Sequence, residues 1–388
     1  MATTSSLSRL RLVDPQLDPG WAHVRVPAGP PADWVRRPPG PTDVAPLEQV
    51  RIPGAGRMWS LPQWLTETHA TSLLVSVGGS LVHEWYAEGC GPQTRFLGAS
   101  MTKSVLSLLV GRAVLSGALD PSDRVVDRVP ELAGSGYAGC RVGHLLTMTS
   151  GVAWQEDYRD TGSPASMLLA RFADGRGGSR DLLAQIGAED PPGTRFRYCT
   201  ADSQVLDWVR ERATGRSFAA ALDELWAAAG CGEDALVAVD AGDGVALAGG
   251  GLAATAYDWG RVAALLLAGD TAGTDWADWV EACCVPSEPF LAPGRLPSSL
   301  TTHAGFGFAW WPLDAAGRRV AADGSRGQFA YADRDLGVTV VRTSAWPYDD
   351  RLVDRQLRDL CYLGLPVIAE AAAGVSPDHD PTTQEAAP

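Results

Sequence analysis

Residues 97–115 read LGASMTKSVLSLLVGRAVL, and this stretch combines a candidate reactive pair with the start of an apolar helix. The spacing of its apolar residues predicts a helix over Met101–Leu115. Ser100 and Lys103 are three residues apart, so a helix places their side chains on one face. Ser100 also falls in the first turn, where unpaired backbone N–H groups favour a developing negative charge. The stretch therefore predicts a nucleophilic serine activated by a neutral lysine. The alternative is a capping serine beside a solvent-facing lysine.

The rest of the sequence makes this lysine unusual. Lys103 is the one lysine among 32 basic residues, and the chain contains no asparagine. Arginine stays protonated in proteins, whereas a desolvated lysine can lose its proton. Lys103 is thus the one position at which the chain has a side-chain amine that can lose its proton, which supports a role for Lys103 as a base. The alternative is that a single lysine occurs here by chance.

The overall composition indicates an acidic globular protein. Hydrophobic residues make up 45% of the 388 residues and charged residues 20%, so the chain can bury a sizeable core. A net charge of −14 without basic clusters argues against nucleic acid or anionic membranes as partners. The sequence has no long apolar run and no secretory signal, so a cytoplasmic protein without a membrane span is expected. The seven scattered cysteines predict buried thiols, and neither a metal nor another cofactor is expected.

The organisation along the chain predicts an α+β fold. A hairpin is expected at residues 71–87 around a Gly-Gly turn, and helices dominate the middle of the chain. Further strands are expected at Gly305–Trp311, Gln328–Ala332 and Gly337–Thr343, followed by a final amphipathic helix at about 349–363. Strands at both ends predict one antiparallel sheet built from both termini, with flanking helices and an inserted helical lobe. The expected divisions are a Pro-rich N-terminal arm at 1–48, a catalytic domain at 49–373 and a disordered tail at 374–388. Within the domain, the α/β part covers about 49–115 and 305–370, and the helical lobe covers about 116–304.

Five segments in a fixed order resemble a known family. They read LGASMTKS around Ser100, VGHLLTMTSGVAW at 142–154, PGTRFRYCTADSQVL at 192–206, GGGLAATAYDWGRV at 249–262 and GSRGQFAYADRDLGVTVV at 324–341. The pattern resembles the serine β-lactamase-like hydrolases, the SxxK group of penicillin-recognising enzymes, over roughly residues 50–370. Within this group it is most similar to the class C-like esterase and amidase branch that includes the 6-aminohexanoate-dimer hydrolases. The resemblance implies a β-lactamase/transpeptidase-like fold.

The resemblance also implies roles for the three catalytic candidates. Ser100 would be the nucleophile and Lys103 the amine that helps take its proton. Tyr198, in Tyr198-Cys199-Thr200, matches the family's second motif, Y-x-N or Y-x-S, whose phenol moves protons between serine, lysine and leaving group. Without the resemblance, Tyr198 would be read as a core tyrosine after a turn.

The family's third motif, K-T-G or H-x-G, falls on residues 324–328. The resemblance implies that an edge strand there presents the backbone N–H of Ser325, which would form an oxyanion hole with the N–H of Ser100. Arg326 and Gly327 are then candidates for substrate binding, with Arg326 able to hold a substrate carboxylate. The alternatives are a glycine-rich turn and a solvated arginine.

Three aromatic residues complete the candidate site. The resemblance implies that Tyr158 hydrogen-bonds a leaving amine. Trp154 and Trp310 are candidates for the wall of the substrate pocket, although large aromatic residues more often belong to the core.

The departures from the family pattern narrow the expected function. No asparagine is available for S-D-N or Y-x-N, Thr200 stands in the asparagine position, and K-T-G is impossible with one lysine. A serine acyl-enzyme acting on a small ester or amide is therefore expected, rather than a true β-lactamase. The alternatives are an ATP-independent transacylase that passes the acyl group to an amine, and a sensor that is acylated without turnover. A homodimer is also expected from the resemblance.

Overall fold

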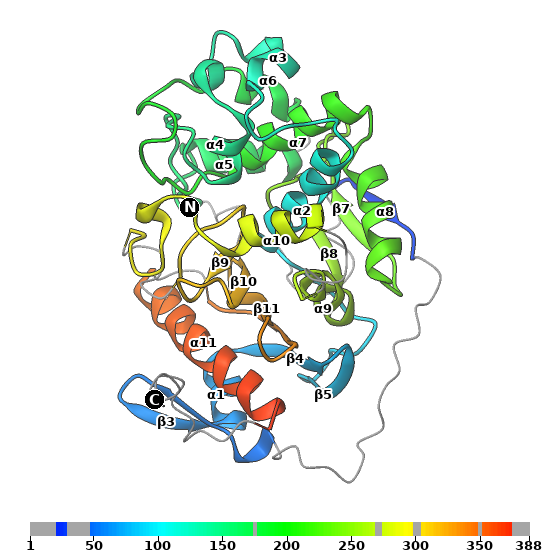
Figure 1. Ribbon diagram of the computed structural model, residues 1–388, viewed down its shortest axis with the longest axis vertical. Helices are drawn as coiled ribbons and strands as arrows, with labels where there is room; N and C mark the ends of the chain where they lie inside the picture. The colour runs from blue at the N-terminus through cyan, green and yellow to red at the C-terminus, as the bar shows by residue number, and fades with distance from the viewer. Residues whose placement is uncertain are drawn as a thin grey trace, which may run out of the picture.

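The computed structural model describes residues 21–28, 47–173, 177–267, 274–297, 304–347 and 351–374. At its centre lies a six-stranded antiparallel sheet, built from segments near both ends of the described chain (Figure 1). The α+β fold with a sheet from both termini is thus confirmed. In spatial order the strands are β5 (Ser80–Tyr86), β4 (Ala70–Val77), β12 (Val338–Ser344), β11 (Gln328–Asp333), β10 (Arg319–Gly324) and β9 (Trp311–Pro312).

Both faces of this sheet are covered, which explains why β4 and β12 are buried along nearly their whole length. Successive side chains of a strand point to opposite faces. Val341 lies close to Gly260 of α9 (Ala256–Ala264). The next residue, Arg342, instead contacts Cys361 of α11 (Arg351–Ala372). The predicted hairpin is confirmed as β4 and β5, with Gly78 and Gly79 both at positive φ in the turn.

A second, four-stranded sheet leads the chain into the region around Ser100. Its strands are β1 (His23–Val26), β7 (Ala235–Ala238), β8 (Leu252–Thr255) and β6 (Arg95–Leu97). β6 ends three residues before Ser100, and β8 begins just after a loop that returns to Lys103. β1 lies within the region expected to be an arm, and most of that arm lies outside the described residues. A small hairpin is formed by β2 (Arg51–Gly54) and β3 (Arg57–Ser60).

The middle of the chain is mainly helical and lies above the six-stranded sheet in Figure 1. Helix α2 (Met101–Leu115) matches the predicted bounds and is buried on all sides over most of its length, because it runs between the sheet and the other helices. The remaining helices are α1 (Leu61–Glu67), α3 (Val125–Arg128), α4 (Val142–Leu146), α5 (Pro164–Ala173), α6 (Ser179–Leu183), α7 (Thr200–Thr214), α8 (Phe218–Ala229) and α10 (Thr274–Cys284). Short 3-10 turns occur at Leu47–Gln49, Pro130–Leu132, Gly136–Gly139 and Pro289–Leu291.

Two predicted elements differ from the structure. The strand expected at Gly305–Trp311 is a loop until β9, because the backbone at Gly307 packs against α10. A Cβ at Gly307 would lie 2.1 Å from the Cys283 carbonyl oxygen. The final helix continues beyond its expected end, through Pro366 to Ala372, because its buried apolar face continues.

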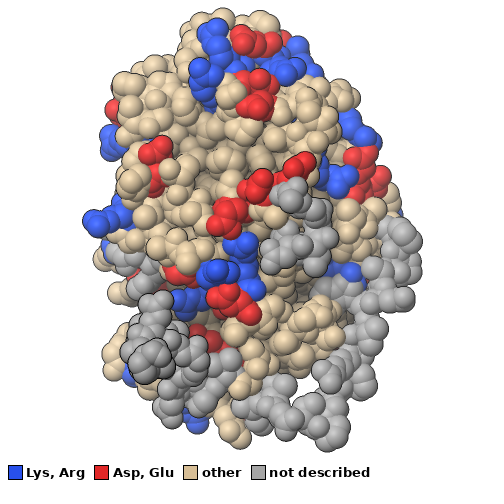
Figure 2. Space-filling model, in the orientation of Figure 1, with Lys and Arg blue, Asp and Glu red and all other residues tan. Residues whose placement is uncertain are grey.

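The described surface is mixed in charge. Figure 2 shows acidic and basic side chains interspersed over one face. No helix among the described residues has both the length and the apolar character needed to span a membrane. All seven cysteines are free thiols, and Cys90 is half-buried where a buried thiol was expected.

Candidate active site

Ser100 lies at a sharp turn between β6 and α2. The preceding residue, Ala99, has φ +45°, a left-handed conformation that costs free energy in any residue other than glycine. The turn is held because Gly98 donates its N–H to the carbonyl oxygen of Leu252, at 2.9 Å. Ser100 then begins the helix, and its hydroxyl makes no capping hydrogen bond. The hydroxyl is therefore available to groups outside the helix backbone.

Lys103 points from the first turn of α2 into the protein, and its side chain is not solvent-facing. Its residue exposure is 3%, its Nζ donates to Ser100 Oγ at 3.1 Å, and it donates to the Gly249 carbonyl oxygen at 2.5 Å. Burial lowers the pKa of Lys103 from its ordinary 10.5 to about 8, although the nearby Glu156 opposes this change. A substantial fraction of this amine is neutral at mildly alkaline pH, so it can accept a proton from Ser100.

Tyr198 completes a triangle with these two residues. It lies just before α7, its ring centroid is 5.1 Å from Lys103 Nζ, and its ring stacks on Trp311 at 5.9 Å. Burial raises the pKa of Tyr198 well above its ordinary value, and a hydrogen bond with the Ser100 side chain opposes this rise. The phenol therefore stays protonated and can donate a proton next to the serine oxygen.

A carboxylate missed by the sequence reasoning lies at the centre of the site. Glu156 accepts hydrogen bonds from Trp154 Nε1 at 2.5 Å and from the Tyr158 hydroxyl at 2.5 Å. It also accepts from the N–H and Oγ1 of Thr200, at 2.9 and 2.5 Å. Glu156 thus holds together two predicted site residues and the residue in the family's asparagine position. The sequence signal was its place between them in Trp154-Gln155-Glu156-Asp157-Tyr158, but no motif singles it out.

Ser325 lies in the turn between β10 and β11, beside the nucleophile turn. Gly324 approaches that turn so closely that a Cβ on it would lie 2.1 Å from the Gly98 carbonyl oxygen. Ser325 and Ser100 line the same cavities. Arg326 and Gly327 do not line either of these cavities. Both have positive φ, and Arg326 Nε donates to the Trp346 carbonyl oxygen at 3.0 Å. The linings of these two cavities therefore give no support to substrate binding by Arg326 or Gly327.

The two tryptophan candidates differ in whether they line a cavity beside Ser100. Trp154 lines the larger cavity beside Ser100, as expected. Trp310 is fully buried and lines neither cavity, so its assignment to the pocket is wrong. Its neighbour Trp311 lines the larger cavity and packs against Tyr198. Of the two adjacent tryptophans, only Trp311 is among the residues that line these two cavities.

Two cavities meet at Ser100, Tyr158 and Ser325. The apolar cavity has a volume of about 50 Å³ and is walled mainly by Trp21, Leu97, Leu168, Leu169 and Leu247. The polar cavity has a volume of about 500 Å³ and is lined by residues that include Glu156, Arg159, Arg197, Tyr198, Trp311 and Arg358. The serine hydroxyl thus lies between a narrow apolar space and a wide charged one.

A buried ion pair supports β10, the strand that leads into the turn of Ser325. Arg358 of α11 pairs with Asp323, which lies two residues before Ser325 on β10. The hydroxyl of Tyr362 donates to the other oxygen of Asp323 at 2.8 Å. Burial raises the pKa of Asp323, and the adjacent guanidinium opposes that rise. The pair ties the C-terminal helix to the floor of the polar cavity.

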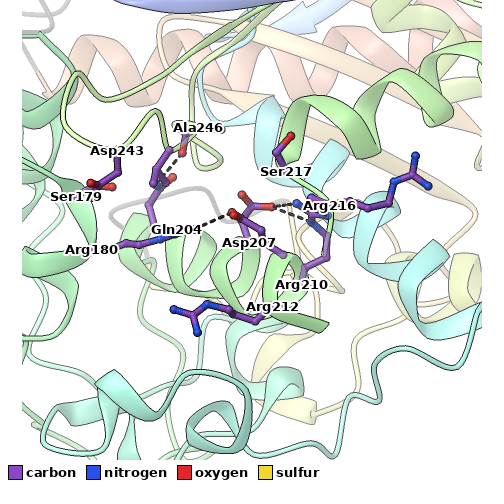
Figure 3. A network of polar contacts seen from close by, with 12 residues as sticks. Ser179, Arg180, Gln204, Asp207, Arg210, Arg212, Arg216, Ser217, Asp243 and Ala246 are labelled. Atoms are coloured by element: carbon purple, nitrogen blue, oxygen red, sulfur yellow. Dashed lines mark hydrogen bonds and ion pairs between the residues drawn. The ribbon is translucent and has the colours of Figure 1, made fainter. Parts of the chain in front are cut away.

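Gln204 of α7 positions the carbonyl group that accepts from Lys103. Figure 3 shows its side chain reaching Ala246, to whose carbonyl oxygen it donates at 3.0 Å. Its Oε1 accepts from the N–H of Gly249 at 3.0 Å. Farther along α7, the Asp207–Arg210 ion pair in the same view is almost fully buried. Helix α7 therefore positions both Tyr198, two residues before its first residue, and the loop that contacts Lys103.

Comparison with known proteins gives a consistent assignment. The family model described as Beta-lactamase matches residues 44–362. The 6-aminohexanoate-dimer hydrolase of Paenarthrobacter ureafaciens is 31% identical over 341 residues, covering 85% of this chain and 86% of that protein. Among solved structures, a Bacillus anthracis protein provisionally described as a 6-aminohexanoate-dimer hydrolase has a TM-score of 0.72 at 22% identity, with 89% of each chain covered. EstCE1, described as a hydrolase with promiscuous acyltransferase activity, has a TM-score of 0.58 at 19% identity, covering 78% of this chain and 96% of its own. The chain therefore belongs to the β-lactamase family of serine enzymes.

Proposed function

We propose that this protein is a serine acyl-enzyme that cleaves a small ester or amide through Ser100, Lys103 and Tyr198. The observation that carries the proposal is the buried Lys103 amine, 3.1 Å from Ser100 Oγ in a site with a lowered amine pKa. A solvent-exposed lysine would stay protonated at neutral pH and could not take the serine proton.

In the acylation step, Ser100 Oγ attacks the substrate carbonyl carbon while its proton passes to the neutral amine of Lys103. The carbonyl oxygen gains negative charge, and the backbone N–H groups of Ser100 and Ser325 stabilise it. One such donor is worth about 3 kcal/mol. The bond to the leaving group then breaks, and the Tyr198 phenol donates a proton to it. Tyr198 regains a proton from Lys103, which leaves an acyl-serine and a neutral amine.

In the second step, water or another nucleophile attacks the acyl-serine and gives up its proton through the same groups. Water gives hydrolysis, and an amine gives a new amide without ATP. The polar cavity, at about 500 Å³ beside Tyr198, supports the transacylase as a second candidate because an acceptor molecule fits there. The acyltransferase activity named for EstCE1, a protein of the same fold, also supports it.

The site supports an ester or amide substrate better than a β-lactam. Thr200, in the position of the family's asparagine, directs both its N–H and its hydroxyl to Glu156 and so is engaged within the protein. The third motif contains no lysine, and Arg326 points to the Trp346 carbonyl group. The lysine and the asparagine that would bind the carboxylate and the amide of a β-lactam are thus both replaced in this chain.

The test is intact-mass analysis of the protein mixed with a short activated ester, with and without small amines. We expect an acyl adduct on wild-type protein, none on Ser100→Ala, and nearly none on Lys103→Arg, which keeps the charge but cannot act as a base. Amide in excess of acid when amine is present would identify a transacylase. Consumption by water regardless of amine would identify a hydrolase, and an adduct that never clears would favour the sensor. Full acylation of Lys103→Arg would refute the proposed base.

A further inference from the structure

The two cavities at Ser100 differ in size and chemistry, and this difference bears on the substrate. We propose that the apolar cavity is the acyl site and accepts only short, uncharged acyl groups, whereas the polar cavity receives the leaving group and any acceptor. This inference rests on the proposed acyl-enzyme mechanism and adds a substrate class to it.

The orientation follows from the place of the proton donor. Tyr198 lines the polar cavity and is not among the residues that line the apolar one. A leaving group must lie next to the group that protonates it, so the leaving group occupies the polar cavity. The substrate carbonyl carbon sits at Ser100, and its acyl chain must then extend in the other direction. That direction is the apolar cavity.

The lining of the apolar cavity decides the chemistry of the acyl group. Among the described residues, none of those lining it is Asp, Glu, Lys, Arg or His. Leu168 and Leu169 of α5 are 1% and 5% exposed, and Leu247 from the facing loop is 4% exposed. A charged end buried there would lose its hydration without a partner, which is costly. An acyl group ending in an ammonium or a carboxylate is therefore rejected.

The volume of the apolar cavity sets the length of the acyl group. On this measure one water-sized group needs about 10–15 Å³, so about 50 Å³ accepts about three to five methyl-sized groups. The expected acyl groups therefore range from butanoyl to hexanoyl. The polar cavity is about 500 Å³, so the alcohol or amine part is under no comparable limit.

The experiment compares activated esters that differ only in the acyl group. We expect kcat/KM to rise about fourfold per methylene from acetyl to about pentanoyl, because each methylene buries more apolar surface. It should then fall at least about tenfold by decanoyl, as the chain exceeds the space. Succinyl and 6-aminohexanoyl esters should react at least about a hundredfold more slowly than hexanoyl. Lengthening the alcohol part by the same number of atoms should change kcat/KM less than about threefold, because that part lies in the polar cavity.

A variant locates the effect in the apolar cavity. Leu168→Ala enlarges the cavity and should move the preferred acyl chain about two to three methylenes longer. The matched control is Leu222→Ala, an equally buried leucine in α8 that lines neither cavity. It should reduce stability without changing the chain-length profile. If Leu168→Ala does not fold, the wild-type ester series alone still tests the inference.

The outcomes separate this inference from the proposed function. Acylation of Ser100 by all chain lengths at similar rates, or by the charged esters as fast as by hexanoyl, would overturn the acyl-site assignment and leave the acyl-enzyme intact. Strong dependence on the length of the alcohol part, without dependence on the acyl chain, would reverse the two cavities. Absence of any adduct on Ser100 with every ester would instead remove the mechanism on which the inference rests.

Discussion

Replacing Lys103 by methionine removes the buried amine and keeps most of the side-chain volume, so it isolates the cost of holding an ammonium in the site. We expect loss of acylation together with a characteristic change in the pH dependence of stability. The folded protein lowers the pKa of Lys103 from 10.5 to about 8, whereas the unfolded chain leaves it near its ordinary value. The buried ammonium therefore lowers the free energy of unfolding at every pH at which the Lys103 amine is charged.

The size of this penalty follows from the two pKa values. Below pH 8 both states are protonated, and the full penalty, about 3 kcal/mol, acts against folding. Between about pH 8 and 10.5 the unfolded chain binds more protons than the folded one, so this group makes stability rise with pH. Above pH 10.5 the penalty is gone. Between about pH 7 and 9.5 the change amounts to about 2 kcal/mol.

Methionine has no such penalty, but it leaves the Gly249 carbonyl group without its donor, at a cost of about 1–3 kcal/mol that does not depend on pH. The assay is urea unfolding of wild type and Lys103→Met at pH 7 and at pH 9.5. The stability difference between them should shift by about 2 kcal/mol in favour of wild type at the higher pH. Ser100→Ala keeps the ammonium and serves as the control, with no such shift. A difference between wild type and Lys103→Met that stays constant with pH would refute the buried-amine reasoning.

Three further outcomes are expected. The acylation rate should increase with pH and level off above about pH 8, as Lys103 loses its proton; stopped-flow measurement with one ester checks this. Arg358→Met leaves the buried Asp323 carboxylate without its cationic partner and should cost about 3–5 kcal/mol in urea unfolding, part of which Asp323→Asn in the same chain should restore. Gly327→Ala should cost about 2–4 kcal/mol and slow acylation, because φ is +85° and the added Cβ would lie 2.3 Å from the Trp346 ring.

Each of the last two outcomes has an internal check. Gly79→Ala also introduces a side chain at positive φ, +78°, but into open space, so it should cost only about 1 kcal/mol and leave acylation unchanged. Equal losses in the two glycine variants would contradict the packing argument at Gly327. For the ion pair, no recovery in the double variant would show that Arg358 acts through contacts other than Asp323.

The strongest local patterns predicted the fold well. The helix of residues 101–115 and the hairpin at the Gly-Gly turn lie where the apolar periodicity and turn chemistry put them. The strand expected at residues 305–311 was wrong, because the glycines there let a loop approach α10 closely. β10, with the sequence RVAADG, has few β-branched residues and was missed, since its stability comes from neighbours on both sides.

Sequence predicted the site residues whose type matches a catalytic motif. It could not predict which way a side chain points. Lys103, alone in its type, and Tyr198 could be matched to a motif, and both lie next to Ser100. Sequence could not tell which of the adjacent Trp310 and Trp311 faces the cavity. It also could not tell that Glu156 points inward, because the direction of a side chain in a loop depends on the packing of distant segments.

The antiparallel pairing of β4 with β12 has a consequence for how this chain is made. Val75 leaves the ribosome roughly 265 residues before its partner Val340, which at 5–20 residues per second is a delay of roughly 13–50 s. Through this interval the apolar hairpin of residues 70–86 has an unpaired edge, a common starting point for aggregation. We therefore expect the nascent N-terminal hairpin to depend on chaperones, and yield on expression to improve when translation of the C-terminal third is fast.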